Sequence, residues 1–153
     1  MRLILFEYFI SRIGGIRTRI GLSDGAAFRK KQEMSFRRKP AGVVYEALSE
    51  GVLDLFEDCS RSASVAGGPF KFTLTGPHML AKMLANRHYG STADLALAIA
   101  DVLAEQVAQI DAEVIQVDEA NLPGAPDEWE WAAEAINRVL KDRKSTRLNS
   151  SHL

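Results

Sequence analysis

The sequence predicts an α/β fold with parallel strands, and three observations within residues 70–141 carry that prediction. Residues 70–75 are rich in β-branched and aromatic side chains, and residues 113–118 are an apolar run that ends in a carboxylate, so both are expected to be strands. Helical patterns lie between these strands and after the second one. Strands separated by helical stretches of this length form right-handed β-α-β units and a parallel sheet. This pattern alone fits a barrel and an open, doubly wound sheet equally well.

The first third of the chain has weaker patterns. An apolar run predicts a helix over residues 3–13 that ends at Gly14-Gly15, because glycine commonly follows the last turn of a helix. Alternating apolar and polar residues predict a strand over residues 16–22. A second short strand is expected over residues 42–48, and a helix over residues 53–66.

Three helices are expected in the second half of the chain. Pro77 suits the first turn of a short helix that runs to Arg87. Ser91, with Asp94 three positions later, has the spacing of a capping box at the start of a longer helix. The apolar face of that helix is regular and is interrupted only by Gln106: Leu95, Ile99, Val102, Leu103 and Ile110. The last helix is expected to begin at Asp127, with Trp129 in its apolar stripe and Trp131 at the edge of the stripe.

The composition is that of one globular domain. The chain has 153 residues, 46% of them hydrophobic and 25% charged, and a formal net charge of −1. This balance argues against a general nucleic-acid binder. The single cysteine, Cys59, allows no internal disulfide, which fits a cytoplasmic protein. The apolar stretch over residues 1–10 contains Glu7 and is too short to span a bilayer, so no membrane partner is expected.

The charge is distributed unevenly along the chain. Residues 1–39 carry ten Lys or Arg against three acids, whereas residues 40–141 carry six against sixteen. The basic segment, residues 12–39, has two interpretations: a solvated extension, or a binding surface for an anionic ligand. Nothing in its spacing selects between them.

Polar residues follow two of the predicted strands. Thr75-Gly76-Pro77 ends the first strand, and Asp118-Glu119 ends the second. In parallel α/β folds ligands bind at the carboxyl ends of the strands. Adjacent residues of a strand point to opposite faces, so we expect Asp118 to face a ligand and Glu119 to anchor the loop or a neighbouring strand. Asp118 could then hold an ammonium group or act as a general base, and the alternative is a structural salt bridge.

The other candidates for chemistry are fewer. His78 lies next to a strand end and either faces the site or bonds to the start of its helix. His88 is expected on the surface, and Cys59 is expected to be a small core residue rather than a nucleophile. The sequence contains no His-x-Cys, Cys-x-x-Cys or His-Glu-x-x-His spacing and no glycine-rich phosphate loop, so it offers no zinc set of its own.

Three segments resemble the catalytic barrel of cobalamin-independent methionine synthase and its single-barrel relatives. They read KFTLTGPHMLAKML, ALAIADVLAEQVAQIDAEVIQVDEANLPG and WAAEAINRVL, all within residues 70–141. The joint occurrence of TGP at one strand end and IQ-x-DE at a later one is specific to that family, whereas residues 6–67 resemble it only weakly. The resemblance implies that residues 1–141 form a partial (β/α)8 TIM barrel, with parallel strands, flanking helices and an unpaired strand edge.

The resemblance also implies an activity. The family transfers a methyl group from 5-methyltetrahydrofolate, or its polyglutamate form, to the thiol of homocysteine, which a zinc ion holds as the attacking thiolate. Asp118 matches the aspartate that holds the homocysteine amino group and is the expected catalytic residue. Glu119, Thr75 and Gly76 are expected beside it in the substrate-binding site.

Two residues depart from the family pattern. Ala120 replaces the proline of a DEP motif, and Met83 stands where many members carry a tryptophan that stacks on the pterin. The methyl donor and the thiol are therefore open. The alternative is another member of the same barrel superfamily, either a methyltransferase acting on another thiol or a uroporphyrinogen-decarboxylase-like protein. A third, non-enzymatic possibility is a small α/β module whose residues 12–39 contact an anionic partner.

The two ends of the chain also carry expectations. The zinc ligands of the family follow the segment that ends at Lys141, so we expect an interior fragment that is inactive alone and binds no zinc tightly, whereas the intact family member holds zinc. Residues 142–153 resemble a translated sequencing adapter, with a natural polar tail as the alternative, and they are left out of the functional argument.

Overall fold

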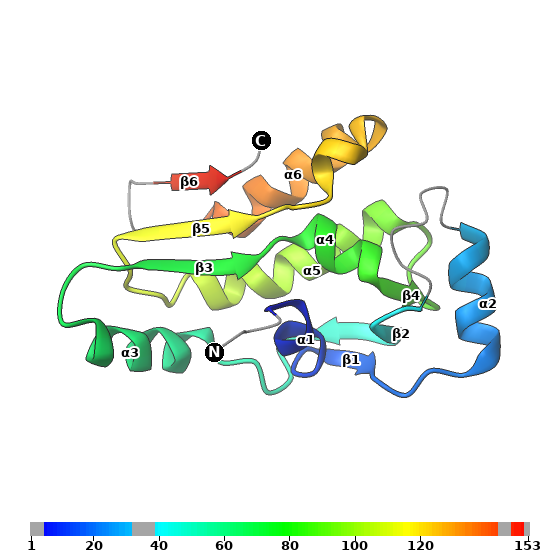
Figure 1. The fold of residues 1–153 in the computed structure, drawn as a ribbon, viewed down its shortest axis with the longest axis horizontal. Helices are drawn as coiled ribbons and strands as arrows, with labels where there is room; N and C mark the ends of the chain where they lie inside the picture. The colour runs from blue at the N-terminus through cyan, green and yellow to red at the C-terminus, as the bar shows by residue number, and fades with distance from the viewer. Residues whose placement is uncertain (1–4, 32–38, 144–147, 152–153) are drawn as a thin grey trace.

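The computed structural model describes residues 5–31, 39–143 and 148–151, which form helices around two three-stranded sheets (Figure 1). The sheets have the strand orders β1-β2-β4 and β3-β5-β6. The elements, in chain order, are α1 (Leu5–Ile10), β1 (Gly14–Arg17), α2 (Leu22–Lys31), β2 (Gly42–Ser49), α3 (Leu55–Ala66), β3 (Lys71–Thr75), α4 (Pro77–Met83), β4 (Leu84–Asn86), α5 (Thr92–Val107), β5 (Val114–Asp118), 3-10 turns at Leu122–Gly124 and Pro126–Glu128, α6 (Trp129–Leu140) and β6 (Leu148–Ser151).

The expected β-α-β unit is present. β3 and β5 pair in parallel from Lys71 opposite Val114 to Thr75 opposite Asp118, with α4 and α5 in the connection between them. In Figure 1 the two strands run side by side with their arrowheads toward the same edge. α6 then packs against α5. The α/β class with parallel strands is confirmed.

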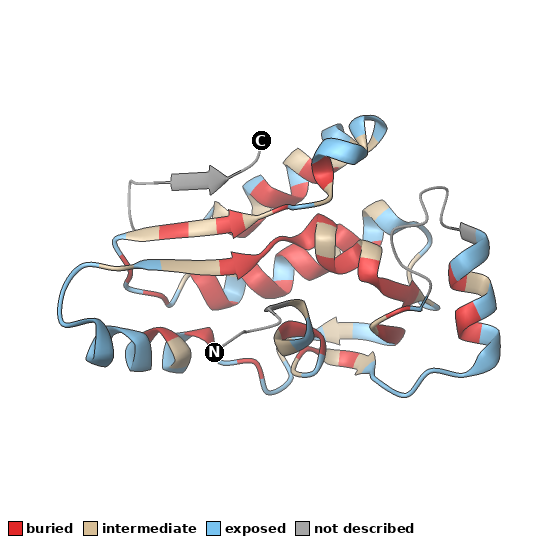
Figure 2. Ribbon diagram, viewed as in Figure 1, coloured by how far each residue is buried: buried red, intermediate tan, exposed pale blue. Residues whose placement is uncertain are grey.

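The core is centred on α5. Leu95, Ile99 and Leu103 are each 0% exposed and pack in one cluster with Ile115 of β5. Figure 2 shows buried stretches along both elements. Gln106, the polar residue on this face, is also buried, because its side-chain oxygen accepts a hydrogen bond from the Leu55 N–H at 2.8 Å. The Ser91 cap is confirmed, since its hydroxyl oxygen accepts from the Asp94 N–H at 3.0 Å.

The other sheet departs from the expectation of parallel strands throughout. β1 is antiparallel to β2, with Ile16 opposite Val44, while β2 and β4 are parallel. Gly15, at a φ of 92°, and Gly51, at a φ of 57°, make the tight approach between β1 and the end of β2, where side chains other than glycine are strained. The strands form two separate sheets, so the partial barrel stays a prediction.

The outer edge of β5 is not unpaired, contrary to expectation. β6 pairs with it in parallel, from Ile115 opposite Leu148 to Asp118 opposite Ser151. An exposed strand edge presents free N–H and C=O groups, and any extended segment of suitable length can satisfy them. The free edge of β5 is thus enough to explain why β6 pairs there. The pairing does not indicate whether residues 142–153 belong to the family-like domain.

Several element boundaries differ from those predicted. Part of the basic segment forms α2, while residues 32–38 lie outside the described part of the chain. The helix predicted to reach Arg87 ends at Met83, because the next three residues pair with β2 as β4. Asn86 then closes a turn by accepting hydrogen bonds from the backbone N–H groups of His88 and Tyr89. A short apolar run such as MLA suits a helix or a strand, so the pairing decided between them.

The two tryptophans exchange their predicted places. Trp129 is 54% exposed, and its ring N–H donates to the Leu122 carbonyl oxygen at 2.8 Å. Trp131 is partly buried and packs against the core. The helix begins at Trp129, after a 3-10 turn, rather than at Asp127, so Trp129 lies at its exposed start, while Ala132, Ile136 and Val139 of the predicted stripe are buried. No helix in the described part of the chain has the length and apolar character needed to cross a membrane.

Candidate functional site

The ends of β3 and β5 meet at one edge of their sheet. Thr75 lies opposite Asp118 in the parallel register, and the Gly76 N–H donates to the Asp118 carbonyl oxygen at 2.8 Å. The expected adjacency of these two strand ends is therefore confirmed. Thr75 is 2% exposed, whereas Asp118 remains partly exposed, so of this pair it is the aspartate that offers a side chain to a ligand.

Asp118 is held by its own strand. The side-chain amide of Gln116 donates to its carboxylate at 2.6 Å, as two residues on the same face of a strand can do. This contact orients the carboxylate. The ligand-binding role of Asp118 stays a prediction at this point.

Glu119 points the other way and is 0% exposed. Its carboxyl oxygen lies 3.5 Å from the Met79 N–H, at the first turn of α4. A Cβ atom at Gly76 would lie only 1.4 Å from the same oxygen, so only glycine leaves room for this side chain. Glu119 thus anchors β5 to the start of α4, and its part in substrate binding stays a prediction.

The protonation of Glu119 is unusual for a carboxyl group. Burial raises its pKa to about 8, the Asp118 charge raises it too, and the N–H groups of Met79 and His78 lower it. At neutral pH the group therefore holds its proton. A neutral carboxylic acid can donate a hydrogen bond as well as accept one.

His78 lies buried between two carboxyl groups. Its Nδ1 is 3.6 Å from Glu119 and its Nε2 is 3.4 Å from Glu128, and the side chain is 0% exposed. The ring packs on Trp131 with centroids 5.1 Å apart. Burial lowers the pKa of His78, and Glu128 opposes that effect. His78 thus faces carboxyl groups, rather than the backbone partner that was the alternative.

Glu128 and Lys82 were not singled out from the sequence. Lys82 Nζ lies 3.1 Å from Glu128, and both border a small cavity of about 180 Å³ together with His78 and Asn121. The available signal was an acidic residue at the expected start of the last helix, but that position is a common place for an acid. Nothing in it indicated a contact with α4.

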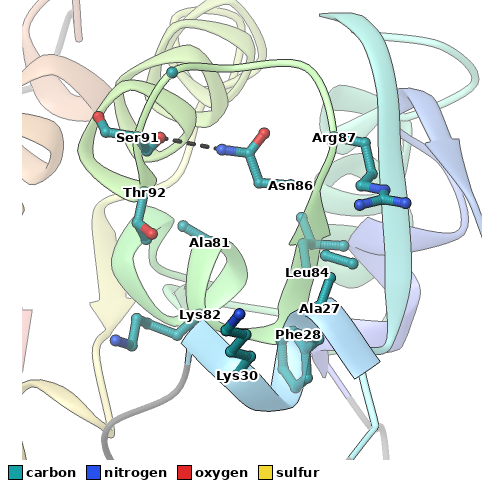
Figure 3. Close-up of a pocket in the computed structure, with 12 residues that line it drawn as sticks. Ala27, Phe28, Lys30, Ala81, Lys82, Leu84, Asn86, Arg87, Ser91 and Thr92 are labelled. Carbon is teal, nitrogen blue, oxygen red and sulfur yellow. Dashed lines mark hydrogen bonds between the residues drawn. The ribbon is translucent and has the colours of Figure 1, made fainter. Parts of the chain in front are cut away.

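A larger cavity of about 480 Å³ lies beyond the other end of α4, between α2, β4 and the start of α5. Figure 3 shows Lys30 and Phe28 side by side on α2, with Arg87 on the segment after β4 at another side of the view. Lys82 also lines it. Arg87 is paired with Asp24 at 3.2 Å. Lys30 is a cationic residue of the predicted basic segment that lines this cavity.

Met83 and Cys59 are both part of the core. Met83 is 6% exposed, so it presents no open face for a ring to stack on. Cys59 is buried in α3, and burial raises the pKa of its thiol, which agrees with the expected core role. Within residues 5–31, 39–143 and 148–151, no three His, Cys, Asp or Glu side chains are grouped to hold a metal ion. These residues do not fit the zinc site that the resemblance implies.

No family model matches the chain, but individual proteins do. It is 36% identical over 145 residues to the methionine synthase of Thermococcus kodakarensis, covering 90% of this chain and 40% of that protein. It is 38% identical over 74 residues to the methionine synthase of Sulfurisphaera tokodaii, covering 46% and 22%. It is also 30% identical over 116 residues to the 2-hydroxypropyl-CoM lyase of Xanthobacter autotrophicus, covering 74% and 30%.

A solved structure has the same fold. The B12-independent methionine synthase from Shewanella sp. W3-18-1, in complex with selenomethionine, superposes with a TM-score of 0.76 at 21% identity. The match covers 95% of this chain and 42% of that one. The chain thus spans between 22% and 40% of the length of the three curated relatives.

Proposed function

Because the chain belongs to the cobalamin-independent methionine synthase family, we propose that it forms part of a methyltransferase that makes methionine. The reaction transfers a methyl group from a donor such as 5-methyltetrahydrofolate to the thiol of homocysteine. The observation that carries this proposal is the register that sets Thr75 and Gly76 beside Asp118. The TGP and IQ-x-DE motifs, far apart in sequence, meet at the strand edge where α/β proteins bind ligands.

Asp118 is the residue we assign to the substrate. Its carboxylate is partly exposed at the end of β5 and is oriented by Gln116. A carboxylate in this setting can accept charge-assisted hydrogen bonds from the ammonium group of an amino acid. Thr75 and Gly76 form the neighbouring wall, and Glu119 supports that wall from behind. Asp118 thus contacts the substrate, and Glu119 supports the wall that Thr75 and Gly76 form.

Zinc belongs to the proposal only through the family. When bound, a zinc ion would keep the homocysteine sulfur as a thiolate. The described residues do not supply its ligands, so no step of this chain is assigned to the metal. We propose that the 153-residue chain alone is inactive, that residues 142–153 lie outside the family-like domain, and that the protein is cytoplasmic with neither nucleic-acid nor membrane partners.

The larger cavity supports an anionic methyl donor. Lys30, Lys82 and Arg87 line it, and two of these cations also pair with carboxylates, Arg87 with Asp24 and Lys82 with Glu128. The carboxylates of a folate suit the cationic side chains that line this cavity. Met83 is buried in the core, so any stacking partner for the ring has to come from another position.

A second candidate function is transfer to, or cleavage at, a different thiol. The observation that favours it is the 30% identity, over 74% of this chain, to a protein named 2-hydroxypropyl-CoM lyase. The fold and the strand-edge site would be the same, and the thiol would differ. No observation favours the uroporphyrinogen-decarboxylase-like alternative.

Binding of L-homocysteine to the purified chain tests the assignment of Asp118. In Asp118→Asn we expect affinity to fall roughly 10- to 100-fold, because a hydrogen bond to a charged group contributes about 1.5–3 kcal/mol. 4-Mercaptobutyrate, which lacks the amino group, should bind both forms equally. Asp111→Asn, at another exposed aspartate, is the matched control. Unchanged homocysteine affinity in Asp118→Asn would remove the basis of the proposed function.

A further inference from the structure

The proposed function gives His78 no role, yet its buried imidazole lies between two carboxyl groups. The imidazole is 0% exposed, and each ring nitrogen faces a different carboxyl group: Glu119 on β5 at 3.6 Å and Glu128 before α6 at 3.4 Å. Neither nitrogen has a hydrogen-bond partner at these distances, nor has one oxygen of Glu119. Shifts of a few tenths of an ångström would bring both pairs into hydrogen-bond range. Buried polar groups are rarely left unpaired, so the arrangement favours hydrogen bonds on both sides of the ring.

One assignment of hydrogens satisfies every group in the row. The Glu119 carboxyl group, neutral, donates its O–H to His78 Nδ1. The neutral imidazole carries its hydrogen on Nε2 and donates it to the Glu128 carboxylate. Glu128 remains charged, because Lys82 lies 3.1 Å from it and its side chain is 22% exposed. No donor faces a donor in this row, and only the Lys82–Glu128 pair carries charge.

From this geometry we propose that Glu119, His78 and Glu128 form a proton relay between the strand edge that binds substrate and the 180 Å³ cavity beside α6. In one passage the Glu119 O–H bond breaks and a new N–H bond forms at His78 Nδ1. At the same time the Nε2–H bond breaks and the proton passes to Glu128. Net, one proton moves from Glu119 to Glu128, and the imidazole ends with its hydrogen on Nδ1. The reverse passage restores the starting state.

The positions of Glu119 and Glu128, at the two ends of the relay, suggest what the relay does in the reaction. Glu119 is the sequence neighbour of Asp118 and lies against Gly76, so it is next to the proposed substrate edge but shielded from water. A thiol must lose its proton before its sulfur attacks a methyl group. After one passage Glu119 is a carboxylate that can take the thiol proton, and the proton on Glu128 can leave through the cavity. One proton then leaves the edge without the edge opening to water. This use rests on the proposed function, whereas the existence of the relay does not.

The surroundings of His78 contain few other charges. Lys82, on the same helix, pairs with Glu128, and Asp118, on β5, adds to the negative charge near Glu119. Trp131 of α6 covers the ring and carries no charge. His78 touches no substrate in this scheme and acts through Glu119, so it is a positioning residue rather than a catalytic one.

Nitrogen-15 NMR of the full chain tests the relay without any substrate. We expect the His78 ring at pH 7 to be neutral with its hydrogen on Nε2, and its resonances to follow a second inflection near pH 8, where Glu119 loses its proton. Glu119→Gln still donates a hydrogen bond but cannot give up a proton, so that inflection should vanish. Glu128→Gln should lower the pKa of His78 further, because the opposing negative charge is lost.

Two controls keep the test independent of folding. Glu130→Gln changes an exposed acid of α6 close to Glu128 and should leave the His78 resonances unchanged. His78→Gln assigns the signal against those of the other two histidines, His88 and His152. Should a Glu variant not fold, the wild-type chain still decides, because a hydrogen on Nδ1 at pH 7 or the absence of the second inflection would overturn the proposal. Neither result depends on homocysteine binding.

Discussion

Residues 5–66 and residues 71–140 are organised differently, although both contain helices and strands. In the second region one face of α5 and alternate residues of β5 are completely buried, as at Leu95, Ile99 and Ile115. In the first region α3 is exposed along its last seven residues and is held mainly through Leu55 and Cys59 (Figure 2). α2 is attached by ion pairs of Asp24 with Arg17 and Arg87. Both regions bury apolar side chains, among them Phe9, Ile10 and Val44 in the first, but α2 and α3 each bury few residues whereas α5 buries a whole face.

This difference shows which helices can be predicted from the spacing of apolar residues in the sequence. A helix that buries a whole face must repeat apolar residues at helical spacing, so its sequence shows it. A helix held by its ends and by ion pairs has no such requirement. The apolar face of α5 was accordingly predicted correctly, whereas α2 was not expected from the sequence. Five experiments can break or sharpen the comparison.

The largest expected effect is a complete absence of turnover. Neither region supplies a group of three metal-ligating side chains within the described residues, so the 153-residue chain should not methylate homocysteine with added zinc and 5-methyltetrahydrofolate. Methionine formation by mass spectrometry and zinc content by atomic emission are the measurements. Stoichiometric zinc would show that the comparison has missed a site.

Shortening a buried side chain of the second region should cost the most stability. Ile99→Ala leaves a cavity in the centre of the core and should lower the free energy of unfolding by about 2–5 kcal/mol. Val65→Ala, at an 86% exposed position of α3, should stay within about 0.5 kcal/mol. Urea unfolding measures both. Equal losses would contradict the distinction between the two regions.

Alanine substitutions at two glycines compare the packed site, at Gly76, with the exposed turn after α3, at Gly68. Gly76→Ala places a Cβ 1.4 Å from the Glu119 oxygen and should cost about 1–3 kcal/mol through overpacking, with loss of Asp118-dependent binding. Gly68→Ala meets no atom within 4 Å and should be nearly neutral. Thermal unfolding of the two variants, compared side by side, gives the answer. A neutral Gly76→Ala would mean that Glu119 is not seated where the structure has it.

The pH dependence of stability reports the buried carboxyl group. The pKa of Glu119 is about 8 in the folded chain against 4.5 for an ordinary glutamate, so the folded state binds more protons between these values. The free energy of unfolding should therefore fall as pH rises through this range, by at most about 1.4 kcal/mol per pH unit, and level off above pH 8. His78, with its lowered pKa, acts in the opposite direction only below its ordinary value of 6.5. The interval from pH 7 to pH 8 thus isolates Glu119.

Glu119→Gln should remove that slope, since the amide keeps the shape and the hydrogen-bond donor but does not titrate. Glu105→Gln, at an exposed position of α5, should keep it. Urea unfolding at pH 7, 7.5 and 8 is the measurement. A slope that persists in Glu119→Gln would assign the effect to another group.

The smallest expected effect concerns the basic segment. Lys30→Gln should weaken binding of a folate by a fewfold, since Lys30 lines the larger cavity, and the effect should shrink as salt is raised. Arg29→Gln, one position away and exposed, should bind as the wild type does. Equal effects of the two substitutions would indicate a diffuse basic surface instead of a site.

The successes and failures of prediction have physical causes that differ by element. The Ser91 cap and the apolar face of α5 were readable because both depend on residues within a turn or two of each other. β4 was missed because its formation depends on β2, some forty residues earlier in the chain. Trp129 was misplaced because it is the first residue of α6, before the helix reaches the packed face that Ala132, Ile136 and Val139 form as predicted.

The residues of the candidate site also fall into those that the sequence could place and those that it could not. Residue patterns and family likeness were enough to place Thr75, Gly76 and Asp118 at strand ends, because parallel strands bring their carboxyl ends to a common edge. They could not show that His78 sits between Glu119 and Glu128, since that contact requires α6 to dock against α4 and joins positions such as Lys82 and Glu128 that are 46 residues apart. Local sequence chooses helices, strands and the faces they bury. Which charged groups then share a dry interior depends on how those faces pack, and packing is a property of the folded chain as a whole.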